Sequence, residues 1–238
     1  DFQNNKVLNQ PLNPAERVDL AQIPSPYLSG LLDRYLDDER LCPIIETTRG
    51  CPYSCTFCCW GTSTKSKLYK IPEDRVAEEI RYIAKRTKVK RGQLYIADGN
   101  FGILPRDIGL SEEIAKCTEE LGFPKATYVY YAKNTSQKVI DVATNLRDLG
   151  MMSMSKQSLN EKTLELVKRK NISHEKFDEL RDICEERGIK TFCELIYGLP
   201  GEGYESFTAG AIKTIREGQS VIFLPLRLDA GSEMASSK

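Results

Sequence analysis

Three cysteines, Cys51, Cys55 and Cys58, lie within eight residues at C-x3-C-x2-C spacing. An apolar run that includes Ile44 and Ile45 precedes them in the chain. Three thiolates from one short loop can ligate three irons of a cubic [4Fe–4S] cluster and leave the fourth iron without a protein ligand. An iron with an open position can bind a substrate as well as carry electrons. The spacing therefore predicts a chemically active iron–sulfur centre.

A structural zinc site is the main alternative for these thiols. Structural zinc takes four protein ligands, usually from paired C-x2-C units or with histidine. The chain has one C-x2-C unit among these cysteines, and its single histidine, His174, is distant in sequence. Cys59 adjoins Cys58, and adjacent residues rarely bind one tetrahedral ion, so we interpret Cys59 and Cys42 as neighbours of the site. The spacing favours iron and sulfur over zinc.

The composition describes a globular chain of 238 residues, which is enough for one large α/β domain. Lys and Arg number 34, as do Asp and Glu, so the net charge gives no case for nucleic acid as a partner. No run approaches the ~18 apolar residues of a membrane span, and residues 1–20 lack the apolar core of a signal peptide. We expect no membrane association. Eight cysteines then favour a metal centre in a reducing cytoplasm over a secreted disulfide framework.

From residue 43 onward, strand and helix patterns alternate along the chain. Six strands are expected at residues 43–47, 93–97, 126–132, 151–155, 191–197 and 221–226. Helices are expected at residues 72–88, 111–121, 137–149, 161–168, 174–187 and 204–217. Such alternation indicates parallel strands with right-handed crossovers. We therefore expect an α/β fold, with an N-terminal arm at residues 1–40 and one core domain at residues 41–238.

Polar or glycine-rich residues follow every expected strand. The cysteine loop follows the first strand, and residues 98–102 follow the second. Lys133 and Asn134 follow the third strand. The last three strands lead into residues 156–160, 198–202 and 227–231. Because chemistry in parallel α/β folds lies at the carboxyl ends of the strands, we expect these loops to surround the cysteines.

The segment from Cys51 to Cys58 resembles the cluster motif of the radical S-adenosylmethionine (radical SAM) superfamily. Its spacing, its place after a first strand and the aromatic Phe57 before the third cysteine all match. The resemblance covers roughly residues 40–235 and implies a partial (β/α)6 barrel, which the six strands indicate independently. It implies that Cys51, Cys55 and Cys58 ligate a [4Fe–4S] cluster whose fourth iron binds S-adenosylmethionine (SAM).

The resemblance also implies where SAM is bound. Asp98, Gly99 and Asn100 stand in place of a more usual Gly-Gly-Glu, in the second-strand motif that contacts the methionyl amino group. Residues 157–158 would approach the ribose, and residues 194–202 resemble the motif that lines the adenine. The expected cofactor-binding residues are Phe57, Asp98, Gly99, Asn100, Gln157, Ser158, Arg169, Glu194, Ile196 and Gly198. Of these, Arg169 would pair with the SAM carboxylate through a bidentate fork.

In the family, an electron from the reduced cluster cleaves SAM to methionine and a 5′-deoxyadenosyl radical, which abstracts hydrogen from a substrate. The resemblance therefore predicts a radical SAM enzyme. Its expected partners are a small-molecule or peptide substrate and an electron donor of the flavodoxin or ferredoxin type. The cofactors do the difficult chemistry, so no side chain is assigned as catalytic.

A narrower resemblance begins with residues 24–30. They are similar to the segment that leads from a cobalamin-binding domain into the core of the cobalamin (B12)-dependent subgroup. This implies methyl transfer, with cobalamin held by a domain absent from this chain. We then expect either the core of a larger protein or a member without that domain. A methylthiotransferase-like enzyme, a non-catalytic iron–sulfur or SAM-binding scaffold and an inactive truncated core remain as alternatives.

Overall fold

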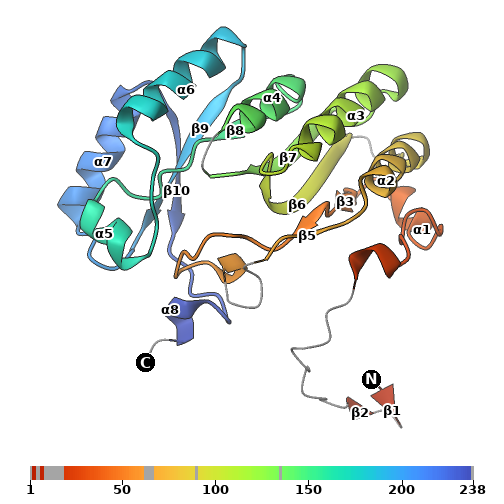
Figure 1. Cartoon of the computed structure of the whole chain (residues 1–238), viewed down its shortest axis with the longest axis horizontal. Helices are drawn as coiled ribbons and strands as arrows, with labels where there is room; N and C mark the ends of the chain where they lie inside the picture. The colour runs from red at the N-terminus through yellow and green to blue at the C-terminus, as the bar shows by residue number, and fades with distance from the viewer. Residues whose placement is uncertain are drawn as a thin grey trace.

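Two parallel three-stranded sheets form an arc in the computed structural model, which describes residues 2–3, 6–7, 19–61, 67–88, 91–133 and 136–236 (Figure 1). The first sheet has the order β3 (Ile44–Ile45), β6 (Gln93–Phe101), β7 (Ala126–Tyr131). The second has the order β8 (Met152–Ser153), β9 (Thr191–Tyr197), β10 (Ser220–Pro225). Contacts between β7 and β8 join the two sheets, so the six strands follow one another in chain order.

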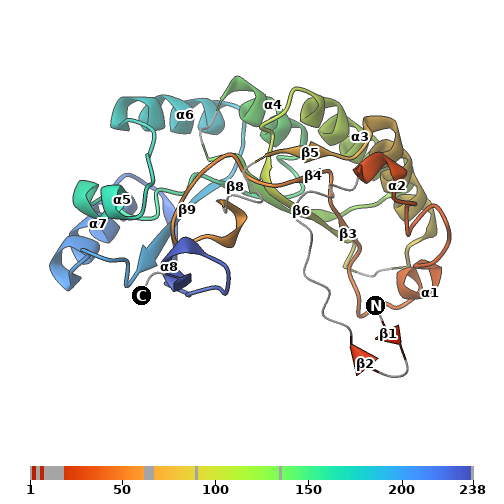
Figure 2. The ribbon, with the colours of Figure 1, turned by 60° about the horizontal axis from the view of Figure 1, so that its bottom comes forward.

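Helices cover the convex side of this arc (Figure 2). They are α2 (Glu73–Arg86), α3 (Arg106–Leu121), α4 (Gln137–Asn145), α5 (Glu161–Leu166), α6 (His174–Glu186) and α7 (Tyr204–Arg216). Parallel strands alternating with outer helices agree with the partial (β/α)6 barrel expected from the sequence. The short helix α8 (Glu233–Ser236) lies on the other side of the sheet from these helices.

The core lies between the sheet and the helices. Val76, Ile80 and Ile83 of α2 recur at helical spacing and are buried. They share one hydrophobic cluster with Leu94 and Ile96, which point to the same face of β6 because strand side chains alternate. The helix expected at residues 72–88 is therefore present as α2, and its apolar face is the buried one.

The segment before the barrel also packs on it. Tyr27 is buried, and its hydroxyl donates to the Ile44 carbonyl at 2.6 Å and accepts from the Ile44 N–H at 3.0 Å. Leu20, in the short helix η1 (Leu20–Gln22), and Leu36, in α1 (Asp33–Leu36), join the main core. Most of residues 1–18 of the expected arm lies outside the described residues. The short antiparallel strands β1 (Phe2–Gln3) and β2 (Lys6–Val7) are the exceptions.

Several element bounds differ from the expectation for local reasons. Strand β6 continues through Phe101, four residues beyond the expected end, and its pairing with β7 shifts register between Ile96 and Phe101. Helix α3 begins at Arg106 rather than at residue 111, since Asp107 Oδ2 accepts from the N–H groups of Gly102 and Leu104 at 2.9 and 3.0 Å. Asp107 therefore organises the turn that leads into the helix.

Two strands that the sequence did not indicate complete the fold near the cysteines. They are β4 (Thr48–Arg49) and β5 (Tyr69–Lys70), which pair antiparallel. Among the described residues, no helix combines the length and the apolar character needed to cross a bilayer.

Candidate metal and cofactor site

The cysteine loop is closed at its base by strands β4 and β5. Thr48 pairs with Lys70 and Arg49 with Tyr69, and the Ile71 N–H donates to the Thr47 carbonyl at 3.0 Å. Between these strands the chain leaves β4 at Gly50, whose φ of 104° lies in the region that favours glycine. The three cysteines therefore sit on a loop whose two ends are hydrogen-bonded to each other.

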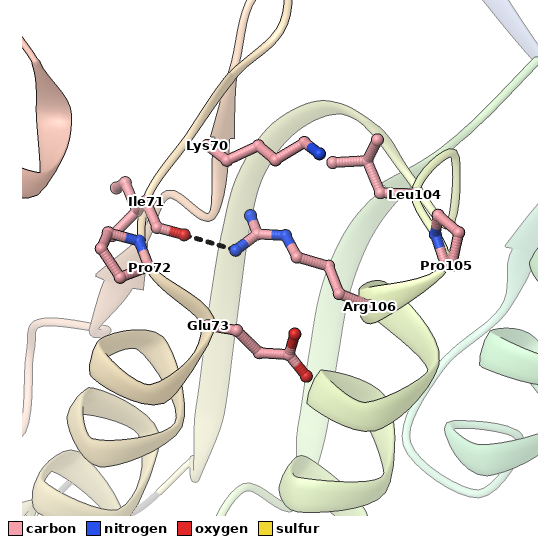
Figure 3. A pocket seen from close by; sticks show the side chains of 7 residues that line it. All are labelled: Lys70, Ile71, Pro72, Glu73, Leu104, Pro105 and Arg106. Carbon is pink, nitrogen blue, oxygen red and sulfur yellow. Dashed lines mark hydrogen bonds between the residues drawn. The ribbon is translucent and has the colours of Figure 1, made fainter.

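Arg106, the first residue of α3, fastens this base to the helical layer (Figure 3). Its guanidinium donates to the carbonyl of Ile71, to the Thr47 carbonyl at 2.5 Å and to Thr48 Oγ1 at 3.0 Å. A cavity of about 460 Å³ lies beside it, and the Glu73 carboxylate also lines this cavity. Because the Arg106 donors are directed at the loop base, we interpret this side chain as a clamp rather than a ligand-binding group.

Asp98 fastens the same base from β6. Its side chain is buried at 2% exposure, with Oδ1 accepting from the Thr47 N–H at 2.7 Å and Oδ2 from Thr47 Oγ1 at 2.6 Å. Burial raises the Asp98 pKa to about 6, and the hydrogen bonds from Thr47 oppose that rise. The structure thus places this carboxylate at the root of the cysteine loop.

Asn100 of the second-strand motif contacts the cysteines, whereas Gly99 does not. Asn100 is buried, and its Nδ2 donates to Cys51 Sγ at 3.0 Å, while its Oδ1 is buried without a partner among the described residues. Gly99 faces the ring of Trp60, which an added Cβ would meet at 3.6 Å. Asn100 is therefore the member of this motif in direct contact with a predicted metal ligand.

The three predicted ligands are free thiols on one loop. Cys51 and Cys55 are buried at 3% and 6% exposure, and Cys58 is half-buried. Burial raises the pKa of the Cys58 thiol. Across the described residues, no three His, Cys, Asp or Glu side chains are placed to hold a single metal ion. A cubic cluster instead distributes its ligands over separate irons, so an all-sulfur set on one loop fits a cluster rather than one zinc ion.

The second half of the loop is held by the opposite end of the barrel. The Thr56 N–H donates to the Val167 carbonyl at 3.1 Å, and the Met234 N–H donates to the Thr56 carbonyl at 2.9 Å. Phe57 packs in a small hydrophobic cluster with Val167 and Ile196. The loop therefore bridges the first sheet, the end of α5 and helix α8, and Phe57 is one of the bridging side chains.

Cationic side chains surround Cys55. A cavity of about 280 Å³ is lined by residues 52–55, Lys133 and residues 168–170. Lys133 Nζ lies 3.9 Å from Cys55 Sγ. Arg169 is buried at 5% exposure, interacts with the same thiol, and donates to the carbonyl of Ser155. Burial lowers the Arg169 pKa, and the interaction with Cys55 opposes that shift. The predicted carboxylate-binding arginine thus adjoins a predicted cluster ligand.

The expected ribose-binding residues, Gln157 and Ser158, are hydrogen-bonded to β9 and to the loop that follows it. We call the surface formed by residues 155–158 and 194–202 the wall. Gln157 has a left-handed φ of 65°, its N–H donates to the Glu194 carbonyl at 2.9 Å, and its carbonyl accepts from the Ile196 N–H at 2.7 Å. The hydroxyl of Ser158 donates to the Glu202 carboxylate. Gln157 and Ser158 are therefore held in place by backbone and side-chain bonds that the protein itself provides.

The expected adenine-side residues belong to the same wall. Glu194 Oε2 accepts from Ser155 Oγ at 2.5 Å, and Ile196 is buried. Gly198 follows β9 with a φ of 88°, which favours glycine, and an added Cβ would lie 3.7 Å from Leu226. Arg169 and Phe57 link this wall to the cysteine loop, since one bonds Ser155 and the other packs on Ile196.

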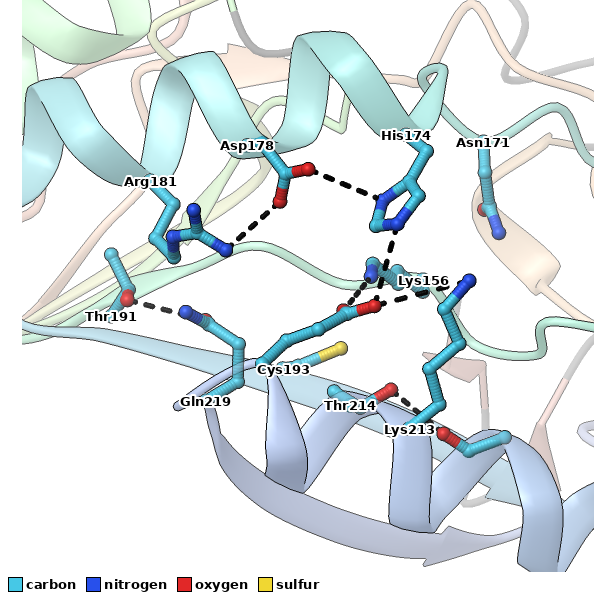
Figure 4. Close-up of polar contacts among 12 residues, drawn as sticks. Lys156, Asn171, His174, Asp178, Arg181, Thr191, Cys193, Lys213, Thr214 and Gln219 are labelled. Carbon is cyan, nitrogen blue, oxygen red and sulfur yellow. Dashed lines mark hydrogen bonds and ion pairs between the residues drawn. The ribbon is translucent and has the colours of Figure 1, made fainter.

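Lys156 and Glu217 form a buried ion pair that the sequence did not indicate, and Figure 4 shows its surroundings. Lys156 is 9% exposed, its Nζ lies 3.0 Å from Glu217 Oε2, and it also lies 3.6 Å from the centre of the Phe177 ring. His174 and Lys213 approach the same carboxylate at 3.6 and 3.9 Å. No spacing motif marks such a pair, because its members come from a strand-end loop and the end of a distant helix. Asn134, after β7, lies outside the described residues.

Comparison with known families gives one match that spans most of the chain. The model of the radical SAM superfamily matches residues 45–209, which contain the cysteine loop and β6 through β9. The partial barrel expected from the sequence is confirmed by this match and by the structural neighbours.

Two curated relatives are similar to the chain in sequence. One is the cobalamin-dependent radical SAM methyltransferase TokK of Streptomyces tokunonensis, 38% identical over 80% of this chain and 29% of its own length. The other is 2-(S-pantetheinyl)-carbapenam-3-carboxylate methyltransferase of Streptantibioticus cattleyicolor, 37% identical over 84% of this chain and 30% of its own length. The chain thus spans less than a third of either relative.

Solved structures share the fold at lower identity. TsrM of Kitasatospora setae, a radical SAM methyltransferase determined with cobalamin and a [4Fe–4S] cluster, aligns with a TM-score of 0.64 at 20% identity over 81% of this chain and 36% of its own. OxsB, a cobalamin-dependent SAM radical enzyme, aligns with a TM-score of 0.60 at 17% identity over 92% of this chain and 32% of its own.

Proposed function

The chain belongs to the radical SAM superfamily, and we propose that it is the core of a radical SAM enzyme whose Cys51, Cys55 and Cys58 hold a [4Fe–4S] cluster. When bound, the cluster and SAM supply reductive cleavage of the SAM sulfonium and a carbon radical. The observation that carries the proposal is the position of these thiols. They lie on a loop that is closed by β4 and β5 and contacted by Asn100 and Arg169.

The residues of this chain then bind and orient the cofactors. Asn100 donates to Cys51, and its free Oδ1 can accept from the ammonium group of SAM. Arg169 adjoins Cys55, where its guanidinium suits the SAM carboxylate. Gln157 and Glu194 offer a fixed wall for the adenosyl group, with Ser158, Ile196 and Gly198 shaping it. In this assignment residues 41–238 are the core domain and residues 1–40 an arm, and Asp98 supports the loop.

We further propose that the net reaction is cobalamin-dependent methyl transfer to a small molecule. Support comes from the two curated relatives, both named methyltransferases and both above 35% identity to this chain. The Pro24–Gly30 segment, which resembles the entry to the core in the cobalamin-dependent subgroup, points the same way. The chain spans 29% and 30% of those relatives, so cobalamin itself would be held outside the residues described here.

Anaerobic reconstitution tests the first part of the proposal. The chain is loaded with iron and sulfide, reduced chemically and incubated with SAM, and 5′-deoxyadenosine is measured. We expect formation of 5′-deoxyadenosine by the wild-type chain and none by a variant in which Cys51, Cys55 and Cys58 are replaced by Ala. Cluster formation without SAM cleavage would instead favour the scaffold alternative.

Methyl transfer is tested separately with SAM labelled in its methyl group and added cob(I)alamin. Label in methylcobalamin supports the cobalamin-dependent reaction. The test is repeated on a full-length homologous protein. If both proteins form 5′-deoxyadenosine but put no label into cobalamin, the cobalamin-dependent reaction is contradicted.

A further inference from the structure

We propose that three tyrosines on the concave face of the first sheet bind a small molecule through an acyl oxygen, the C=O of a carboxylate or an amide. The inference rests on the proposed function and deepens it, because it names the chemical class of the methyl acceptor. The tyrosines are Tyr95 of β6 and Tyr128 and Tyr130 of β7. Together with Ile44 of β3 we call them the tyrosine platform.

The tyrosine platform lies on the face of the sheet that the outer helices do not cover (Figure 2). Ile44 pairs with Tyr95, and Tyr95 pairs with Tyr128, so these three residues form one row across β3, β6 and β7. Paired residues of neighbouring strands share a face, and Tyr130 points the same way as Tyr128. Val129, which lies between them in the chain, is buried in the main core on the helical side.

Large side chains of the tyrosine platform remain exposed. The exposed fraction is 54% for Ile44, 40% for Tyr128 and 42% for Tyr130. Helix α8 lies on the same side of the sheet and leaves these side chains uncovered. A group of neighbouring aromatic and aliphatic side chains that stays exposed marks a binding surface.

The three rings hold one another in a fixed arrangement. Tyr95 and Tyr128 are stacked, with ring centres 4.5 Å apart and an angle of 15° between the ring planes. Tyr130 meets Tyr128 edge to face, at 5.2 Å and 80°. Both geometries are favourable for aromatic pairs. The hydroxyl groups are therefore positioned before a ligand binds.

The hydroxyl groups can donate to an acceptor. The Tyr128 hydroxyl donates to the Tyr130 hydroxyl at 3.2 Å, and Tyr130 also shares a hydrogen bond with Tyr95. Each phenol has one proton to donate, so two contacts among three hydroxyls leave one proton for a ligand. Burial, followed by the contacts with Tyr128 and Tyr95, raises the pKa of Tyr130, which keeps this phenol protonated at neutral pH.

This chemistry favours an acceptor oxygen over a cation. A cation binds over the open face of an aromatic ring, whereas Tyr95 and Tyr128 turn a face toward each other. Ile44, next to Tyr95 in the row, offers an aliphatic contact beside the hydroxyls. The tyrosine platform therefore suits a molecule with an apolar body and an acyl oxygen.

Ligand-observed NMR titrations with hexanoate, hexanamide and hexylammonium test the proposal, since the three probes share an aliphatic chain and differ in the polar group. We expect the wild-type chain to bind hexanoate and hexanamide more tightly than hexylammonium, and the tighter of the first two identifies the acyl group. Y95F/Y128F/Y130F keeps the rings and should bind hexanoate on the order of tenfold more weakly. The matched control, Y35F/Y82F/Y204F, removes three hydroxyls from α1, α2 and α7 and should bind as the wild type does.

A second variant, I44S, keeps the three hydroxyls and changes an exposed side chain. It should weaken hexanoate and hexanamide binding by a similar factor. Equal hexanoate binding by the two triple variants, or hexylammonium as the tightest probe, would overturn the proposal. Failure of the proposed function gives a different result, because these titrations need neither cluster nor SAM: the chain then forms no 5′-deoxyadenosine and still binds hexanoate.

Discussion

Thr47 donates two hydrogen bonds to the buried carboxylate of Asp98, one from its backbone N–H at 2.7 Å and one from its hydroxyl at 2.6 Å. These hydrogen bonds join the base of the cysteine loop to β6. The Arg106 guanidinium donates to the carbonyl of the same threonine, so Thr47 is held by a carboxylate on β6 and by a cationic side chain on α3. The geometry of the cysteines depends on these contacts, and not on the loop sequence alone.

Asp98 should make stability depend on pH. Burial raises its pKa from 3.8 to about 6, so between these values the folded chain binds a proton that the unfolded chain has released. The contribution of Asp98 to the free energy of unfolding is therefore greatest below pH 4, and it is lost as the pH rises to about 6. A pKa difference of two units corresponds to a loss of about 3 kcal/mol. Relative to D98N, the wild-type chain should lose that amount between pH 4 and pH 7. Urea unfolding of both proteins measures it, and a pH-independent difference between them would contradict the burial argument.

Arg106 should be required for cluster loading as well as for stability. R106M removes the donors to Ile71, Thr47 and Thr48, and we expect a loss of about 2–3 kcal/mol because hydrogen bonds from charged groups are involved. Iron content after reconstitution should fall with it. The control is R147M, since Arg147 is half-exposed on the surface and its ion pair with Asp148 is 3.7 Å long. Full iron content in R106M would refute the role of Arg106 as a clamp.

Much of the barrel could be predicted from periodicity, but the contacts of the loop base could not. Strand β9 has the bounds expected from its apolar residues, 191–197. Strands β4 and β5 have two residues each, too few for a pattern, and they form because Thr48 and Arg49 find partners twenty residues away. Their pairing is a tertiary effect with no local signal.

The same limit applies to the site residues. The spacing of the cysteines was readable because one loop carries all three. By contrast, the sequence placed Asp98 and Asn100 together after a strand, whereas the structure keeps both in β6 and gives them different partners. Lys156 and Glu217 are separated by sixty-one residues, so their pairing depends on the path of the whole chain.

Asn100 should tune the reduction potential of the cluster. Its Nδ2 donates to Cys51 Sγ at 3.0 Å, and a hydrogen bond to a ligating sulfur stabilises the reduced, more negative state. N100L should therefore lower the midpoint potential, by about 59 mV for a tenfold change in the equilibrium. An EPR-monitored redox titration measures the shift. N145A serves as the control because Asn145 donates to Ser111 and not to a cysteine. A midpoint potential in N100L identical to that of the wild type would rule out an effect of the Asn100–Cys51 contact.

The Lys156–Glu217 pair should be strongly coupled. E217Q leaves the buried Lys156 ammonium without its carboxylate, and we expect a cost of about 3 kcal/mol. K156M/E217Q should cost less than the sum of the single variants, with a coupling energy above about 1.5 kcal/mol in a double-mutant cycle. The exposed Lys116–Glu120 pair, at 3.8 Å, should give less than about 0.5 kcal/mol. Equal coupling in both cycles would show that burial does not matter here.

The central claim is that three cysteines hold a [4Fe–4S] cluster with one iron open to SAM. The most direct measurement is iron and sulfide content together with the EPR spectrum of the reduced cluster, before and after SAM is added, in the wild type and two variants. We predict about four irons in the wild type and in C42A/C59A, a SAM-dependent change in both spectra, and no cluster when Cys51, Cys55 and Cys58 are replaced by Ala. Zinc in place of iron, loss of the cluster in C42A/C59A, or a spectrum unchanged by SAM would contradict the claim.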